Sequence, residues 1–216
     1  MADLEYIPQA TVYRLSLYHC YIGEMIRAGE DEKNVTSRML ADELDIREET
    51  VRRDLSYIGG VGRRGVGYSM GTLFEALSEF LGLYDEYPIL RIGSAQMLRA
   101  LEVVFPPDAY GVRPVAYFSE QPEDVGTMIG ELEVRHVTEI PQLDRDLDVN
   151  VALVACSQPW IDPVLEMLSE AGVRGVLLLT PKVKLDRPEG MNVRHVRMPC
   201  DIKSLACGCK IPVAAV

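Results

Sequence analysis

Four arginines in a short stretch are the residues of this chain best suited to contact nucleic acid. Arg52 and Arg53 lie in a segment with helical spacing, and Arg63 and Arg64 follow in a nine-residue stretch that holds five glycines. Guanidinium groups neutralise phosphates and donate paired hydrogen bonds to base edges. With Asp54 subtracted, the local charge is +3 (four minus one), whereas the whole chain carries −11. This contrast predicts a local DNA-contacting surface and argues against coating of nucleic acid through bulk charge.

A helix, a tight turn and a second helix are needed to present these arginines. We expect Thr36 or Ser37 to cap the first helix, and Glu48 to begin the second. On the second helix the apolar residues share one face, so its polar residues project outward toward a groove. The glycines that follow predict a hairpin, or wing, with Arg63 and Arg64 at its tip. The predicted DNA contacts are Thr50, Arg52, Arg53, Ser56, Arg63, Arg64 and Tyr68. The alternative is a solvated basic helix followed by a flexible loop.

The second half of the chain has a different sequence pattern, in which predicted apolar strands alternate with predicted helices. Such alternation over more than one hundred residues predicts a parallel, Rossmann-like sheet with helices on both faces. The predicted strands are 89–92, 114–118, 149–155 and 176–180, and the predicted helices between them are 96–105 and 163–172. In the first half, amphipathic helices are expected at 11–28 and 72–82.

Composition places limits on the class of protein. The chain has 216 residues, of which 48% are hydrophobic and 25% charged, as expected for two ordinary globular domains. We find no apolar run long enough to span a membrane and no secretory signal, so we expect a cytoplasmic protein. The sequence shows no Ser-His-Asp pattern, paired catalytic carboxylates or P-loop, so we do not expect an enzyme.

Four motifs carry a resemblance to a known family: IPQATVYRL at 7–15, VRRDLSYIG at 51–59, RRGVGY at 63–68 and SLA at 204–206. Through them the chain resembles the Rex family of redox-sensing, NADH-responsive transcriptional repressors. The resemblance implies a winged helix-turn-helix domain at 1–85, a Rossmann-like effector domain at 86–198, and a C-terminal helix and tail at 199–216 that swaps onto a partner. It also implies a homodimer in which each winged domain contacts half of a palindromic double-stranded operator.

The NAD(H) site that the resemblance implies is degraded. The phosphate-binding GxGxxG motif is GSAQML at 93–98, so only Gly93 keeps its glycine, while Ala95 and Leu98 replace the other two. A methyl group at the second position would crowd pyrophosphate, and a larger side chain at the third would push the helix from the strand. Ser119 stands where an acidic residue should hold the ribose, with Glu120 next. The degenerate cofactor positions are Gly93, Ser94, Ala95, Gln96, Ser119, Glu120 and Cys156, and we expect NADH binding to be weakened or lost.

Two further charges depart from the family pattern. Arg14 matches an arginine that should pair with an aspartate of the swapped helix, but Arg197 occupies that aspartate's position and would repel it. Arg91 interrupts the first apolar strand. A buried unpaired charge is costly, so Arg91 must pair with an acidic residue or face a bound anion.

The five cysteines suggest an alternative effector. Cys200, Cys207 and Cys209, together with Cys156 or Cys20, would form a zinc or iron–sulfur site or a redox-active thiol pair if the swapped helix brought them together. The opposing interpretation treats Cys20 and Cys156 as small buried hydrophobic residues. Two other classes stay open: a metal or ligand sensor that acts through protein partners, and a dehydrogenase-like enzyme, which the degraded motif disfavours.

Overall fold

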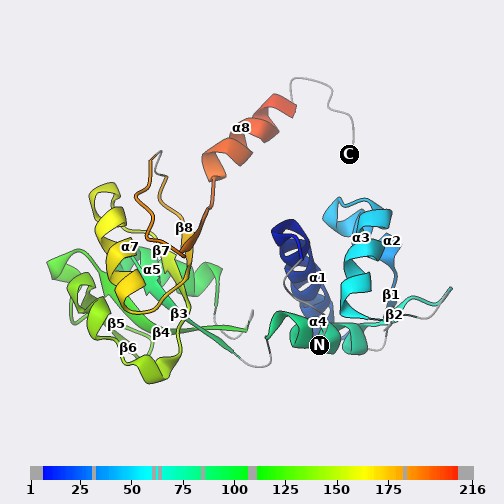
Figure 1. Cartoon of the computed structure of the whole chain (residues 1–216), viewed down its shortest axis with the longest axis horizontal. Coiled ribbons are helices and arrows are strands. Elements are labelled where there is room, and N and C mark those ends of the chain that lie inside the picture. The colour runs from blue at the N-terminus through cyan, green and yellow to red at the C-terminus, as the bar shows by residue number, and fades with distance from the viewer. Residues whose placement is uncertain are drawn as a thin grey trace. The chain divides into compact units, whose positions relative to one another are not determined.

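The computed structural model describes residues 7–30, 33–59, 62, 65–83, 86–106, 111–181 and 184–208. The chain divides into two compact units, with the boundary between Asp85 and Glu86 (Figure 1). Each unit has its own hydrophobic core. The fold class expected from the sequence, a helical N-terminal domain followed by a Rossmann-like parallel sheet, is confirmed.

The first unit is built from helices and one small sheet. Its elements are α1 (Gln9–Arg27), β1 (Asn34–Val35), α2 (Ser37–Leu44), α3 (Glu48–Leu55), the 3-10 helix Ser56–Ile58, β2 (Tyr68–Ser69) and α4 (Met70–Leu81). Thr36 caps α2 by accepting a hydrogen bond from the Met39 amide, as predicted. Asp45 ends α2 in the left-handed conformation, with φ of 51°, which makes the tight turn into α3.

The small sheet of the first unit differs from the predicted hairpin. Among the described residues, Tyr68 pairs in antiparallel fashion with Val35, which precedes α2, rather than with a strand inside the glycine-rich stretch. Gly67 makes this pairing possible, because its φ is +93° and a Cβ atom there would lie 2.5 Å from the Val35 carbonyl oxygen. The predicted tip, Arg63 and Arg64, lies outside the described residues.

The second unit contains a seven-stranded sheet of order β5-β6-β4-β3-β7-β8-β9, parallel except for the β5–β6 pair. The strands are β3 (Tyr87–Ile92), β4 (Val112–Ser119), β5 (Met128–Ile129), β6 (Leu132–His136), β7 (Val151–Val154), β8 (Gly175–Leu178) and β9 (Asn192–His195), and the helices are α5 (Ala95–Val104), α7 (Ile161–Glu170) and α8 (Met198–Gly208). Short 3-10 helices at Pro122–Asp124, Val137–Gln142, Arg145–Leu147 and Gln158–Trp160 connect them. The predicted strands and helices are all present, with boundaries that differ by a few residues.

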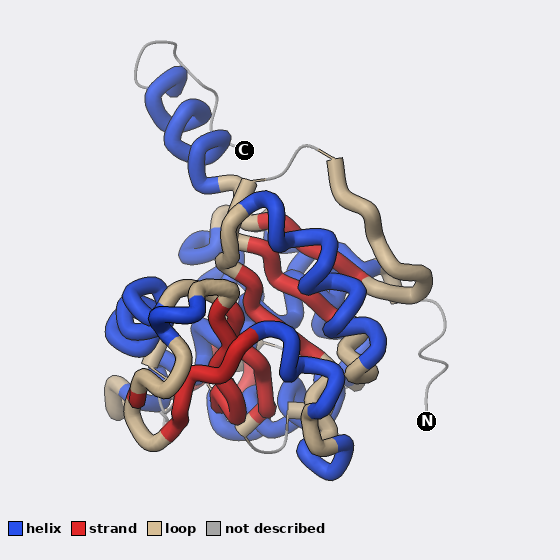
Figure 2. The backbone as a smooth tube through the Cα atoms, turned by 90° about the vertical axis from the view of Figure 1, so that its left-hand side faces the viewer, coloured by secondary structure: helices blue, strands red, loops and turns tan. Residues whose placement is uncertain are grey.

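Helices cover both faces of this sheet (Figure 2). On β4 the side chain of Tyr117 packs in a cluster with Ala95 and Leu98 of α5, whereas Phe118 packs in a second cluster with residues of α7 such as Leu165. Successive strand residues point to opposite faces, so α5 and α7 lie on opposite sides. The strands β5, β6 and β9 lie outside the four strands predicted from apolar runs. β5 and β9 form the two edges of the sheet, and all three strands are short.

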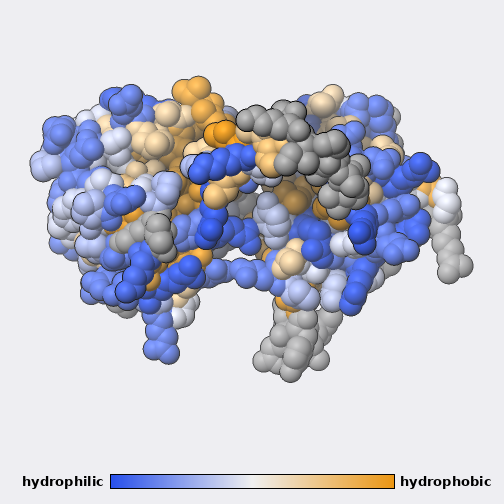
Figure 3. Space-filling view, turned by 90° about the horizontal axis from the view of Figure 1, so that it is seen from above, coloured by the Kyte–Doolittle hydropathy of each residue, from blue (hydrophilic) through white to orange (hydrophobic). Residues whose placement is uncertain are grey.

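The C-terminal helix α8 follows β9 and carries an exposed apolar row. Met198, Ile202 and Leu205 are 57%, 65% and 72% exposed. Elsewhere hydrophilic residues cover much of the face shown in Figure 3, with hydrophobic residues in smaller patches. Among the described residues, every helix is too short or too polar to cross a membrane.

Candidate nucleic-acid interface and effector crevice

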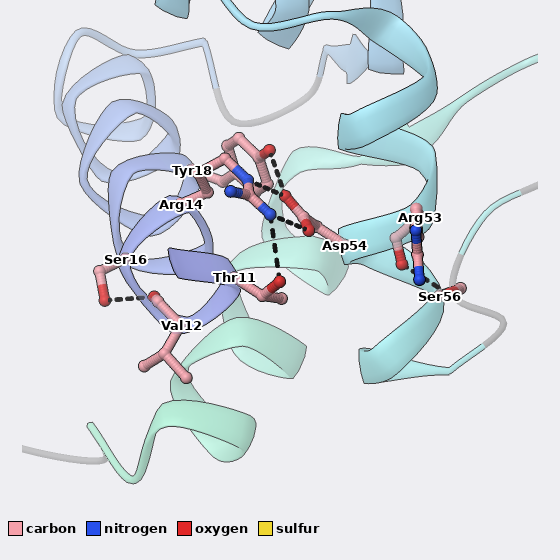
Figure 4. A network of polar contacts seen from close by, with 8 residues as sticks. All are labelled: Thr11, Val12, Arg14, Ser16, Tyr18, Arg53, Asp54 and Ser56. Carbon is pink, nitrogen blue, oxygen red and sulfur yellow. Dashed lines mark hydrogen bonds and ion pairs between the residues drawn. The ribbon is translucent and has the colours of Figure 1, made fainter. Parts of the chain in front are cut away.

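A buried carboxylate fixes α3 against α1. Asp54 is 1% exposed, and its two oxygens accept hydrogen bonds from Arg14 Nε at 2.6 Å and Arg14 Nη2 at 2.8 Å (Figure 4). The Tyr18 hydroxyl donates a third, at 2.9 Å, and Thr11 Oγ1 accepts from the same Nη2 at 3.1 Å. The hydrogen bond to Asp54 raises the pKa of Arg14, and burial followed by that same carboxylate raises the pKa of Tyr18. The orientation of α3 is therefore set by a charged, bidentate contact.

This network corrects the charge expected for the exposed face and gives Arg14 a partner. Asp54 was counted against the charge of the DNA-facing surface, but it lies on the buried side of α3 and is neutralised there by Arg14. Arg14 in turn has a partner inside its own unit and does not depend on the C-terminal helix. The sequence contained the signal, because Asp54 falls three residues after Val51 and directly before Leu55, on the apolar face of α3. A polar residue in that position requires a buried partner.

The opposite face of α3 presents the predicted contacts. Arg52, Arg53 and Ser56 are exposed and Thr50 is half-buried. Glu48 accepts a hydrogen bond from Arg52 Nη2 at 2.6 Å, one helical turn away, and this exposed pair reduces the local positive charge. Ser56 Oγ donates to the Arg53 carbonyl oxygen at 2.6 Å and tightens the end of the helix (Figure 4).

An open hollow of about 960 Å³ lies beside this face. It is bounded by the start of α2, by α3, and by the glycine-rich stretch, and its lining includes Ser37, Arg38, Arg52, Ser56, Gly65 and Tyr68. The structure thus brings Arg52, Ser56 and Tyr68 to one concave surface. Arg38, which the sequence reasoning had not selected, joins them and pairs only loosely with Asp42 at 3.8 Å.

The second unit has the topology of a nucleotide-binding sheet. The strand order reverses around β3, so the carboxyl ends of β3, β4 and β7 meet at a switch point, where such sheets bind ligands. Most of the predicted cofactor positions follow these strands. Gly93 and Ser119 are buried, Ser94 is half-buried, and Gln96 is exposed. Cys156 is 1% exposed, and its carbonyl oxygen accepts from Thr180 Oγ1 at 2.7 Å.

The first turn of α5 is capped by side chains of the chain itself. Ser94 Oγ accepts from the Met97 amide at 3.3 Å, and Asp124 Oδ2 accepts from the Ala95 amide at 2.9 Å. Ser119 Oγ donates to the same Asp124 oxygen at 2.7 Å. In a dinucleotide-binding sheet these amides would face pyrophosphate. The residues present therefore do not fit NAD(H) in that pose, and the sequence reasoning had not identified Asp124.

The side chains that replace the second and third glycines are part of the core of the second unit. Ala95 is 4% exposed and Leu98 is fully buried, and both pack in the core cluster under α5 with Tyr117. The Ala95 methyl is thus part of the core, and the Leu98 side chain fills the contact between helix and sheet. Because these side chains have packing partners, the larger groups are accommodated rather than repelled.

Arg91 is fully buried and pairs with an acidic residue, which was one of the two predicted outcomes. Its Nη1 donates to Glu102 Oε1 at 2.6 Å, and its Nη2 to the Phe105 carbonyl oxygen at 3.0 Å. The Tyr117 hydroxyl contacts the same Glu102 oxygen. Burial and then Glu102 raise the pKa of Tyr117. Arg91 is therefore a structural residue beneath α5, paired with Glu102.

Within the described part of one chain, the cysteines proposed for a metal site do not lie together. Cys200 and Cys207 lie exposed on α8, whereas Cys156 is buried, and no group of three His, Cys, Asp or Glu side chains in the described ranges is arranged to hold a metal. Cys209 lies outside these ranges. Cys20 is exposed rather than buried, so of the two cysteines expected to pack as hydrophobic residues only Cys156 does so. Desolvation, followed by the nearby Glu24, raises the pKa of Cys20, which opposes the thiolate form that metals and oxidants require.

Comparison with known proteins converges on one family. A family model described as "Putative DNA-binding protein N-terminus" matches residues 6–56. The redox-sensing transcriptional repressor Rex of Roseiflexus sp. (strain RS-1) is 29% identical over 196 residues, which is 91% of this chain and 88% of the relative. That of Staphylococcus epidermidis is also 29% identical, over 95% of this chain and 96% of the relative. This chain resembles the Rex repressors.

Solved Rex structures share the fold. RSP, a Rex-family repressor, superimposes with a TM-score of 0.76 at 21% identity, covering 93% of this chain and 92% of RSP. RSP in complex with NAD⁺ and operator DNA gives a TM-score of 0.77 at 22% identity, covering 93% and 91%. At this level of identity the likeness establishes the architecture of the two units. Together with the curated relatives, this confirms the resemblance to Rex expected from the sequence motifs.

Proposed function

We propose that this protein is a sequence-specific DNA-binding transcriptional repressor similar to Rex, which binds a palindromic operator as a homodimer. The observation that carries the proposal is the state of α3. Its orientation is fixed from behind by the Arg14–Asp54 contact, while Arg52 and Arg53 stand exposed on the opposite face. A recognition helix needs this combination of a rigid backing and an exposed basic face.

The comparisons support this function along the whole chain. The curated relatives are named as repressors and cover nearly all of both sequences, and one structural neighbour was solved with operator DNA. Since those relatives are repressors, we propose that the chain acts by binding rather than by catalysis, and that it works in the cytoplasm, where a bacterial operator lies. We assign the DNA contacts to Thr50, Arg52, Arg53, Ser56, Arg63, Arg64 and Tyr68.

The experiment that tests the proposal measures binding of the full chain to a fluorescent palindromic duplex as a function of salt. Replacing one phosphate-contacting arginine should weaken binding and reduce the slope of log K against log salt by about one. We therefore compare Arg52→Ala and Arg53→Ala with Arg99→Ala. Arg99 is exposed on α5 and provides a matched loss of one charge. If all three variants bound the duplex as the wild type does, α3 would not be the DNA-contacting helix.

The effector response is proposed to have changed. NAD(H) binding in the usual pose is weakened or lost, because the Ala95 amide is already bonded to a carboxylate of the chain. The metal or thiol sensor is not favoured, since the described cysteines do not converge.

A further inference from the structure

The segment that follows β4 contains two carboxylates that bridge the switch point. Asp124 accepts a hydrogen bond from the Ala95 amide, in the turn after β3, at 2.9 Å. Glu120 Oε1 accepts from the Ser157 amide, in the turn after β7, at 2.8 Å. One short segment thus binds the backbone on both sides of the point where the strand order reverses.

Both carboxylates are held in place. Ser119 is fully buried, and its hydroxyl donates to Asp124 at 2.7 Å while accepting from the Gln121 amide at 3.1 Å. Glu120 is 8% exposed, and its second oxygen, Oε2, is buried without a hydrogen-bond partner among the described residues. A buried carboxylate oxygen without a donor repels any further anion, because neither charge is neutralised.

We infer that the segment from Ser119 to Asp124 is a built-in occupant of the dinucleotide position. Asp124 takes the Ala95 amide, the backbone donor that a ligand phosphate would need, and both carboxylates add negative charge around the switch point. With this position filled, DNA binding is insensitive to the redox state of the nicotinamide pool, a consequence that rests on the proposed repressor function. The effector unit keeps one conformation because its own chain supplies the contacts that a ligand would otherwise make and break.

Direct binding of NADH to the full chain tests this inference. The single tryptophan, Trp160, lies in the second unit, so energy transfer from Trp160 to the reduced nicotinamide ring reports binding. Asp124→Ala frees the Ala95 amide and the Ser119 hydroxyl and removes one negative charge. We expect it to bind NADH and inorganic pyrophosphate at least about tenfold more tightly than the wild type, since a hydrogen bond to a charged group is worth that factor or more.

Glu123→Ala is the matched control. Glu123 is the exposed neighbour of Asp124 in the same 3-10 helix, so the variant loses the same charge while the Ala95 contact stays intact. We expect it to bind NADH as weakly as the wild type. If Asp124→Ala melts below the assay temperature, Asp124→Asn removes the charge and retains an oxygen that can accept from Ala95, and a smaller gain in affinity is expected.

Three results would overturn the inference: wild-type binding of NADH as tight as that of Asp124→Ala, an equal gain in Glu123→Ala, or folded Asp124 variants as inert as the wild type. In the last case Ala95 and Leu98 would account for the loss. Operator binding measured with and without NADH separates this inference from the proposed function. A wild type that binds DNA and responds to NADH refutes only the built-in occupant. If the wild type binds no operator while Asp124→Ala binds NADH more tightly than the wild type, only the repressor role is refuted.

Discussion

Replacing Asp54 with alanine tests whether α3 is held by its buried carboxylate. The substitution removes three hydrogen bonds, two from Arg14 and one from Tyr18. Breaking a buried ion pair by removing one partner costs about 3–5 kcal/mol, and the Arg14 side chain, which is 25% exposed, can recover part of its hydration. Tyr18 is fully buried, and its unsatisfied hydroxyl adds to the cost. We expect a loss of about 3–4 kcal/mol in the first unit.

The loss should be local, because all of these partners lie in the first unit. Hydrogen exchange followed by mass spectrometry should show faster exchange of α1 and α3 amides, with peptides of the second unit unchanged. For a unit of this size the change corresponds to a fall in its melting temperature of roughly 15 °C or more. Asp42→Ala is the control, since Asp42 is 74% exposed and lies 3.8 Å from Arg38, a surface pair worth less than about 1 kcal/mol. Equal exchange in the two variants would refute the anchoring role of Asp54.

Further predictions concern both cores and pH. Glu102→Ala should destabilise the second unit by about 3–5 kcal/mol, because it leaves the Arg91 charge buried without its partner. Trp160 fluorescence should show unfolding at a lower urea concentration, and an unchanged midpoint would contradict the pairing. Gly67→Ala should cost about 2 kcal/mol or more in the first unit, since its φ is +93° and a Cβ would collide with β1. Gly71→Ala, with open space around its Cβ, should be neutral or stabilising when measured by circular dichroism. Burial, followed by the charge of Arg27, lowers the pKa of His19 in the folded protein below its ordinary 6.5. The stability that neutral His19 contributes is therefore complete above pH 6.5 and is lost as the pH falls through the folded pKa. His19→Gln should therefore reduce the loss of stability between about pH 7 and pH 5, and an unaltered pH dependence would refute this assignment.

The sequence by itself determined the elements and their order. Periodicity located α1, the two helices around the Asp45 turn, and the apolar strands, because burial of one face imposes a spacing that is visible along the chain. The arginines of α3 and the motifs shared with Rex were likewise local features. The short strands β5, β6 and β9 were not among the four strands located by their apolar runs, because a strand of so few residues shows little periodicity.

Only the tertiary structure decided how the charged residues are used. Asp54 and Arg14 are 40 positions apart, and Asp124 lies 29 positions after Ala95. No spacing along the chain marks such pairs. The sequence showed that the GxGxxG motif was altered to carry a methyl and an isobutyl group. Only the fold shows a carboxylate at the amide where a phosphate would bind, because the carboxyl ends of β3 and β4 meet at one edge of the sheet.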